Sequence, residues 1–357
     1  MAAIIRKDAA VVASLRAGLL HWYDAHGRDL AWRRGDRDAY RVWLSEVMLQ
    51  QTTVAHAAPY YAKFLGLWPT VADLAAAEDG RVMAEWAGLG YYARARRLLK
   101  CARVVVRDHG GVFPDSGVDL LALPGFGPYT AAAVAAIAFG QAANVVDGNI
   151  ERIMTRLYAI TEPLPVAKAA VREAAAQWLG PERAGDWPQA LMDLASLICR
   201  PKTPLCPQCP LQAGCLAFQQ GGPEAFPVKL TKAARPRRHG VVFVMIAGDA
   251  VIVERRPDKG LLGGMLGLPH TPWRPEPWTD AEIAAPDLPF SRAGQYEHVF
   301  THFALTQTVW LARLTAEQGQ SLLRAHNDWQ ALPLAEVAAL PTAFRKALGF
   351  DTYGALI

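Results

Sequence analysis

The chain has 357 residues, of which 52% are hydrophobic and 20% charged, with a formal net charge of +4. This composition excludes a disordered chain, gives room for two or three domains with cores of their own, and is compatible with a nucleic-acid partner. No apolar run approaches the ~20 residues that span a bilayer, and the N-terminus lacks a signal-peptide pattern, so we expect no membrane partner and a cytoplasmic protein, or a nuclear one in a eukaryote.

Residues 1–225 are expected to be almost wholly helical, because apolar periodic segments alternate there with short breakers. The first helix is predicted from about Asp8 to Tyr23. A second, from Tyr40 to Thr53, is apolar on nearly every face and should be buried. Glu46 lies on this apolar wall, where burial would raise the pKa of its carboxyl and make it a proton donor near neutral pH. The alternative is a structural carboxylate held by a tyrosine or an arginine.

Two glycines, Gly125 and Gly127, join two predicted helices in the segment LPGFGPYTAAAVAAIAFG, residues 123–140. Glycine lets a turn take positive φ and lets another backbone approach closely. Pro128 suits the first turn of the following helix, whose free amides can hold a phosphate. The segment is therefore either a plain helix–helix turn or a phosphate-binding hairpin.

Asp147 precedes a helix that should begin near Asn149. Aspartate is a good N-cap, and capping alone would explain it. Further helices are expected over 131–138, 166–179 and 187–199.

Four of the five cysteines are tightly grouped, with the spacing C-x6-C-x2-C-x5-C: Cys199, Cys206, Cys209 and Cys215. Four thiolates this close can wrap one metal centre, which indicates a reducing compartment and not a disulfide framework. Zinc and a [4Fe–4S] cluster both accept four thiolates, so the residues alone leave the metal open.

A basic stretch with two prolines follows and is expected to be an interdomain linker over 226–239 that can also touch phosphates. Residues 240–357 indicate a separate α+β domain. Strand pairs are predicted in GVVFVMIAGDAVIVERR and in QYEHVFTHFALTQTVWLARL, and a surface loop over 269–290.

These motifs resemble the MutY-type adenine DNA glycosylases of the helix-hairpin-helix, iron–sulfur superfamily. The resemblance covers nearly the whole chain: the cysteine spacing, the hairpin followed by Asp147, and WLSEVMLQQTTV around Glu46. It implies a multidomain protein with an all-α glycosylase domain and a C-terminal α+β Nudix-like domain that recognises 8-oxoguanine. The implied glycosylase domain, 1–225, comprises a hairpin module at about 30–140 and an iron–sulfur module made of the N-terminal helix and about 141–225, with a [4Fe–4S] cluster on the four cysteines.

The resemblance further implies a monomer that flips adenine out of double-stranded DNA, where it stands opposite 8-oxoguanine or guanine, and hydrolyses its glycosidic bond. Glu46 would protonate the base and Asp147 would stabilise the oxocarbenium ion, with Tyr129 and Asn149 supporting Asp147 and the attacking water. Tyr129 stands where related lyases carry a lysine, so strand cleavage should be weak or absent. The resemblance places Arg28, Leu30 and Trp32 around the adenine and Gln189 and Asp193 beside it. Gln51 and Tyr91 would wedge into the base stack around the opposite base. The other implied DNA contacts are Gly125 and Gly127 at the hairpin, and Phe300, Thr301 and His302 at 8-oxoguanine.

The chain departs from the family pattern at Ala31, where proline is common, and at Thr301, where serine is usual. The C-terminal domain also lacks the glutamate-rich R-E-x-x-E-E helix that binds Mg²⁺ in Nudix hydrolases, so pyrophosphate hydrolysis is not expected. Two alternatives stay open. One is a pyrimidine glycosylase of the endonuclease III type, and the other is a catalytically silent mismatch-binding protein.

Overall fold

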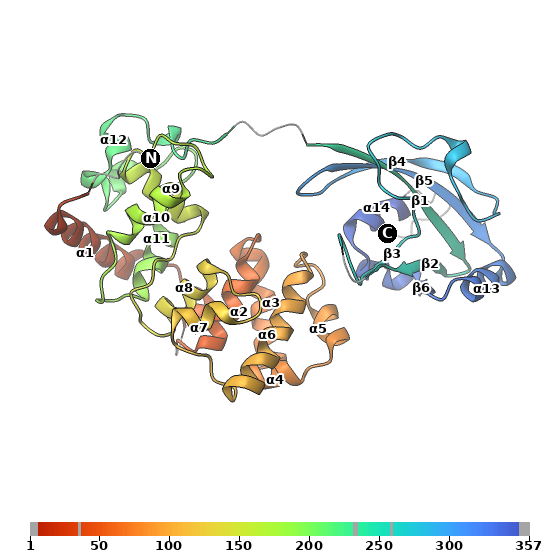
Figure 1. The fold of residues 1–357 in the computed structure, drawn as a ribbon, viewed down its shortest axis with the longest axis horizontal. Coiled ribbons are helices and arrows are strands. Elements are labelled where there is room, and N and C mark those ends of the chain that lie inside the picture. The colour runs from red at the N-terminus through yellow and green to blue at the C-terminus, as the bar shows by residue number, and fades with distance from the viewer. Residues whose placement is uncertain (1–5, 35–36, 231–234, 258–259, 350–357) are drawn as a thin grey trace. The chain divides into compact units, whose positions relative to one another are not determined.

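The computed structural model describes residues 6–34, 37–230, 235–257 and 260–349. It divides the chain into two compact units, 1–231 and 232–357 (Figure 1). Among the described residues, no helix combines the length and the apolarity that a membrane crossing requires.

The described part of the first unit consists of helices and turns, apart from an isolated bridge between Leu164 and Lys229. This confirms the predicted all-α domain. The helices are α1 (Ala9–His26), α2 (Ala39–Leu49), α3 (Val54–Leu67), α4 (Val71–Ala76), α5 (Asp79–Glu85), α6 (Ala93–His109), α7 (Gly117–Ala122), α8 (Pro128–Ile137), α9 (Gly148–Leu157), α10 (Lys168–Ala176), α11 (Asp186–Leu197) and α12 (Leu216–Gln219).

Helix α2 is shorter than the sequence predicts. It ends at Leu49, because Gln51 takes a φ of 58°, in the left-handed region that a helix cannot continue through. Thr53 belongs to the next helix as its N-cap, and its hydroxyl accepts a hydrogen bond of 3.3 Å from the amide of His56. The predicted end of the helix at Thr53 was therefore wrong.

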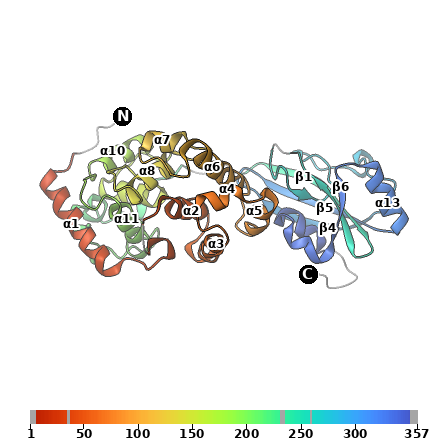
Figure 2. The same cartoon turned by 90° about the horizontal axis from the view of Figure 1, so that it is seen from below.

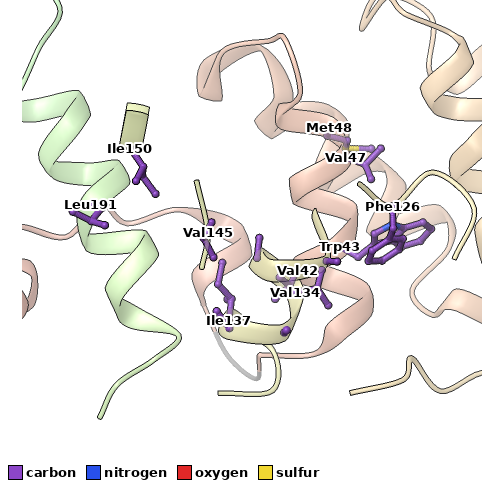
Figure 3. Close-up of a cluster of buried hydrophobic side chains, with 14 of the residues drawn as sticks. Val42, Trp43, Val47, Met48, Phe126, Val134, Ile137, Val145, Ile150 and Leu191 are labelled. Carbon is purple, nitrogen blue, oxygen red and sulfur yellow. The ribbon is translucent and has the colours of Figure 1, made fainter. Parts of the chain in front are cut away.

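The core of the first unit fixes α2 against the hairpin helix α8. Figure 3 shows Val42 of α2 beside Val134 of α8, and Trp43 against Phe126 of the hairpin turn. The rings of Trp43 and Phe126 are stacked with centroids 6.2 Å apart, and Phe113 lies 5.2 Å from Trp43. Such buried aromatic contacts leave α2 little freedom to move relative to the hairpin.

The hairpin between α7 and α8 uses its two glycines differently. Gly125 has a φ of +84°, and a Cβ there would lie 3.0 Å from the Cβ of Arg97. Gly127 has a φ of −112° and caps α8, where its carbonyl accepts from the amide of Ala131. Positive φ therefore explains Gly125 but not Gly127, which corrects the prediction for the second glycine.

The second unit contains β1 (Arg237–Ala247), β2 (Ala250–Arg255), β3 (Leu266–Gly267), β4 (Ser291–Val299), β5 (Ala304–Leu314), α13 (Ala316–Ala325), β6 (Trp329–Pro333) and α14 (Thr342–Leu348). Its strands form one mixed sheet in the order β3-β2-β1-β5-β4, with β6 paired to β2 (Figure 1). Figure 2 shows the same unit from below. Strands β1 and β5 are parallel, whereas β1–β2, β2–β3, β2–β6 and β4–β5 are antiparallel. The predicted pairs β1–β2 and β4–β5 are confirmed.

Strand β1 is buried on both faces, as expected for a central strand. Val242 packs on one face in a cluster with Phe344 of α14, and Phe243 packs on the other, in a cluster that includes Leu322 of α13. The first part of the predicted surface loop over 269–290 is bridged to β1, because the amide of Thr271 donates to the carbonyl of Val241 at 2.9 Å and Arg274 forms an isolated antiparallel bridge with His239. A short 3₁₀ turn follows at Asp280–Glu282.

The expected linker over 226–239 is shorter at both ends. Phe226 is buried, and the carbonyl of Val228 accepts a 3.0 Å hydrogen bond from the amide of Leu164. At the other end, β1 already begins at Arg237. Proline content and charge indicated a linker, but not its ends, because the burial of Phe226 depends on contacts with residues distant in the sequence.

Candidate active site

Glu46 lies in the middle of α2 and is 7% exposed. Its Oε2 accepts a 2.7 Å hydrogen bond from the hydroxyl of Tyr129, in the first turn of α8. Burial raises the pKa of Glu46 to about 7; the Tyr129 hydrogen bond lowers it, and the charge of Asp147 raises it. A carboxyl with this pKa is partly protonated at neutral pH and can act as a general acid.

Glu46 opens onto a cleft with about 420 Å³ of free space, part of it open to solvent. Its walls combine apolar side chains with a few polar groups, as binding pockets do. The cleft brings Glu46 together with four residues that the sequence placed near the adenine: Arg28, Leu30, Trp32 and Gln189. The remaining lining residues are Arg33, Val42, Ser45, Leu49, Val54, Ile137 and Met192.

Asp193 does not line this cleft, which corrects its predicted place beside the base. It is completely buried, and Arg28 donates to it through the backbone amide at 2.8 Å and through Nε at 2.6 Å. Arg33 donates through Nη1 at 2.7 Å and Nη2 at 2.9 Å. Burial acts to raise the pKa of Asp193, but the hydrogen bonds and charges of Arg33 and Arg28 outweigh it and lower the pKa. Asp193 thus anchors the two arginines of the cleft.

Arg33 is a further residue of the cleft, and no motif in the sequence predicted it. Its guanidinium lines the cleft and tends to lower the pKa of Glu46. The available hint was Asp193 itself, because a carboxylate on the buried face of α11 requires a cationic partner. The sequence did not indicate which of the many arginines would supply it.

Asp147 is the N-cap of α9, which confirms the capping role that its position before a helix predicted. Its Oδ1 accepts from the amides of Asn149 at 3.0 Å and Ile150 at 2.8 Å, and its Oδ2 accepts from Nδ2 of Asn149 at 3.0 Å. These bonds fix the carboxylate, and it lies close enough to Glu46 to raise that residue's pKa. Capping and a role beside the sugar are therefore compatible.

A chain of hydrogen bonds leads from Asp147 to the first cysteine. Arg152 donates to Oδ1 of Asn149 through Nη1 at 3.2 Å and to the carbonyl of Cys199 through Nε at 2.9 Å. The same guanidinium donates to Ala195 at 2.9 Å. The cysteine loop and Asp147 are thus connected through one buried cation, Arg152.

The four grouped cysteines line one cavity with about 300 Å³ of free space, together with Arg156, Ile198, Gln212, Phe218 and Pro223. None of the four forms a disulfide, and Nη1 of Arg156 lies 3.2 Å from Sγ of Cys199. Within the described ranges, no three His, Cys, Asp or Glu side chains are close enough to hold a single metal ion. The four thiols that line the cavity are nevertheless the ligand type that a four-thiolate metal centre uses.

The two expected wedges, Gln51 and Tyr91, are exposed and lie outside the cleft lining. Both have left-handed backbones, with φ values of 58° and 49°. Non-glycine residues rarely adopt this conformation, and its cost is about 1–2 kcal/mol per residue. Each side chain is thus held outward at the surface by an unusual turn.

Phe300, Thr301 and His302 form the turn between β4 and β5. The amide of Phe300 donates to the carbonyl of Phe303 at 2.9 Å, and its ring lies 5.5 Å from that of Trp273. Thr301 and His302 are exposed. The loop therefore presents two polar side chains from an aromatic base.

Residues 44–181 match the family described as "HhH-GPD superfamily base excision DNA repair protein", and residues 241–349 match "NUDIX domain". The adenine DNA glycosylase of Homo sapiens is 34% identical, with 95% of this chain and 74% of the human protein covered. The chain belongs to the adenine DNA glycosylase family. This family member is a DNA glycosylase of base excision repair.

Other relatives agree with this assignment of the glycosylase. The adenine DNA glycosylase of Buchnera aphidicola subsp. Schizaphis graminum is 28% identical, with 92% of this chain and 96% of that one covered. The structure of a thermostable thymine-DNA glycosylase has a TM-score of 0.54 at 30% identity, covering 60% of this chain and all of that one. The structure of endonuclease III in a non-covalent DNA complex shares the helical fold. It has a TM-score of 0.51 at 20% identity and covers 60% of this chain and 99% of that one.

Proposed function

We propose that this glycosylase removes adenine that stands opposite 8-oxoguanine or guanine in double-stranded DNA, and that it acts as a monomer. The observation that carries the proposal is the buried Glu46, whose pKa of about 7 suits a general acid, at the wall of the cleft. A base inside a duplex is out of reach, so the adenine must flip into this cleft. Leu30 and Trp32 offer it apolar contacts, and Gln189 and Arg28 offer polar ones.

Glu46 gives its proton to N7 of the flipped adenine, which makes the neutral base a leaving group. The N9–C1′ bond breaks with its electron pair going to the base, and the deoxyribose becomes an oxocarbenium ion. The carboxylate of Asp147, oriented by Asn149, stabilises this positive charge. Water then adds to C1′ and releases a proton. Because Tyr129 offers no amine, no Schiff base forms and AP lyase activity is little or none.

A [4Fe–4S] cluster is the group that best suits the cavity lined by Cys199, Cys206, Cys209 and Cys215. It would cross-link the loop between α11 and α12 and thereby hold its basic residues for DNA binding. Arg156, whose guanidinium contacts Cys199, would offset the negative charge of the thiolates.

The C-terminal domain would recognise 8-oxoguanine through Thr301 and His302. The threonine hydroxyl can both donate and accept, and the imidazole adds a further polar group, so together they can distinguish the altered edge of the base. Phe300, packed on Trp273, would support them from behind.

Single-turnover release of adenine from duplexes with adenine opposite 8-oxoguanine, guanine or thymine tests the proposal. We expect the fastest release opposite 8-oxoguanine, with abasic strands intact until alkali is added. Equal rates opposite every base would refute the role of Thr301 and His302. Tight binding without release would indicate a silent mismatch binder, and release of oxidised pyrimidines in place of adenine would indicate a pyrimidine glycosylase.

A further inference from the structure

Arg94, in the first turn of α6, is a buried arginine outside the cleft lining, only 8% exposed. Its Nη1 donates to the carbonyls of Val47 at 2.8 Å and Met48 at 3.2 Å. Its Nη2 donates to those of Leu89 at 3.1 Å and Gly90 at 3.4 Å. One guanidinium therefore joins two segments that are more than 40 residues apart in sequence.

Both segments lead directly to an exposed residue with a left-handed backbone. Val47 and Met48 belong to the last turn of α2, whose carbonyls lack partners within the helix, and Gln51 follows three residues later. Leu89 and Gly90 immediately precede Tyr91. Arg94 thus caps the end of α2 and fastens the other turn to it.

The guanidinium of Arg94 also lies within cation–π distance of two aromatic rings. Its Cζ is 5.3 Å from the ring centroid of Trp86 and 5.6 Å from that of Tyr91. Trp86 is fully buried, and its Nε1 donates to the carbonyl of Gly90 at 3.0 Å. Tyr91 is 54% exposed, so its ring has the cation on one side and solvent beyond.

The turn before Tyr91 is tied to α3 as well. The hydroxyl of Tyr60 donates to the carbonyl of Ala87 at 2.8 Å, and Nε2 of His56 lies 3.1 Å from the carbonyl oxygen of Gly88. This turn is consequently held on both sides, and Arg94 supplies its connection to α2.

We propose that Arg94 is a positioning residue that fixes Gln51 and Tyr91 relative to each other, so that both enter the base stack beside the flipped nucleotide as one unit. The inference rests on the proposed function, because it concerns how the adenine is brought into the cleft. Arginine suits this task since its planar group can donate to several carbonyls while it stacks on rings. Lysine is also cationic, but its single ammonium group cannot span the two pairs of carbonyls and stack.

The test uses the full chain and a duplex in which 2-aminopurine lies next to 8-oxoguanine, since 2-aminopurine fluoresces more strongly when it is unstacked. The variants are Arg94→Lys and Arg94→Gln. The control is Arg107→Lys, which alters an exposed arginine of the same helix, paired with Asp108. The readouts are duplex affinity, the fluorescence rise on binding, single-turnover adenine release and its pH midpoint.

For Arg94→Lys we expect duplex affinity within about threefold of wild type, at least half of the fluorescence rise lost, and adenine release slowed by at least tenfold. The pH midpoint of release should stay where it is, since the surroundings of Glu46 are unchanged. Arg94→Gln should show the same pattern, and Arg107→Lys should match wild type. In a chain that already carries Gln51→Ala and Tyr91→Ala, adding Arg94→Lys should slow release by less than twofold, because the residues it positions are gone.

A full fluorescence rise with both Arg94 variants would overturn the inference. So would a joint loss of affinity, pH midpoint and folded signal in both, which would reduce Arg94 to a structural role. A wild-type chain that produces no unstacking overturns the inference as well. A wild-type chain that unstacks the duplex without releasing adenine overturns only the proposed function.

Discussion

Glu46 is buried and accepts a hydrogen bond from Tyr129, and these surroundings set the pH range in which its carboxyl is protonated. Burial raises its pKa to about 7. We therefore expect single-turnover adenine release to have a plateau below about pH 7 and to fall about tenfold per pH unit above it, because only the protonated form can donate. The measurement is release between pH 5.5 and 9 with enzyme in excess. A rate that stays constant across this range would remove Glu46 from the role of general acid.

The same burial should make Glu46 a cost to stability at alkaline pH. Its pKa rises from 4.5 in the unfolded chain to about 7 in the folded protein, so the folded state binds more protons in this window and loses stability as the pH rises through it. Glu46→Gln keeps an acceptor for Tyr129 and carries no charge. We expect it to raise the free energy of unfolding by up to about 3 kcal/mol at pH 8 and to have almost no effect near pH 4.5.

Urea unfolding of wild type and Glu46→Gln at pH 4.5 and pH 8 measures this difference in the free energy of unfolding. Adenine release should be abolished in the variant at both pH values. A variant that is less stable than wild type at pH 8 would show that the carboxylate is well solvated or paired in the folded state. That result would also contradict the elevated pKa on which catalysis depends.

At the scale of elements, the hairpin turn separates two roles for glycine. Gly125 has a φ of +84° and contacts Arg97 closely, whereas Gly127 has a φ of −112° with open space around its Cβ position. We expect Gly125→Ala to strain the turn by about 1–2 kcal/mol and to weaken duplex affinity by about tenfold. Gly127→Ala, the matched control, should weaken it by less than threefold. Fluorescence anisotropy with a labelled duplex measures both, and equal losses would refute the distinction.

The cysteine loop supports a second prediction at this scale. Four thiols around one cavity should hold about four iron and four sulfide per chain when the protein is purified without oxygen. Cys209→Ala should lower both contents and weaken duplex binding, while Cys101→Ala, a change at a buried cysteine away from the loop, should leave them unchanged. Iron and sulfide contents are measured in the purified proteins, and one zinc ion per chain in place of iron would contradict the cluster assignment.

Elements that depend on local pattern could be predicted from the sequence. The apolar run around Glu46 gave a buried helix, and Asp147 gave a capped helix start. Details that depend on distant partners could not be predicted. Helix α2 ends at Leu49, where Arg94 of α6 caps its last carbonyls. Asp193 does not line the cleft but accepts hydrogen bonds from Arg28 and Arg33. These pairings join residues far apart in the chain, and nothing in the local sequence specifies them.

For the whole molecule, the decisive feature is the division of the chain at residue 231. Each unit has its own hydrophobic core, and Phe226 and Val228 are bound to the helical unit. A chain cut after Thr231 should therefore fold and keep Glu46, Asp147 and the cysteine loop intact. Since Thr301 and His302 are then absent, we expect it to release adenine opposite guanine within about tenfold of the full chain but to lose most of its preference for 8-oxoguanine.

Single-turnover rates of the truncated and the full chain on both duplexes give this preference as a ratio. Thr301→Ala in the full chain is the matched comparison, because it removes the hydroxyl of the loop and leaves the domain in place. If the two rates of the truncated chain fall equally, the second unit contributes general DNA affinity, since a loss of phosphate contacts weakens binding to every sequence alike. If only the rate opposite 8-oxoguanine falls, recognition of that base belongs to the second unit, while the chemistry belongs to the first.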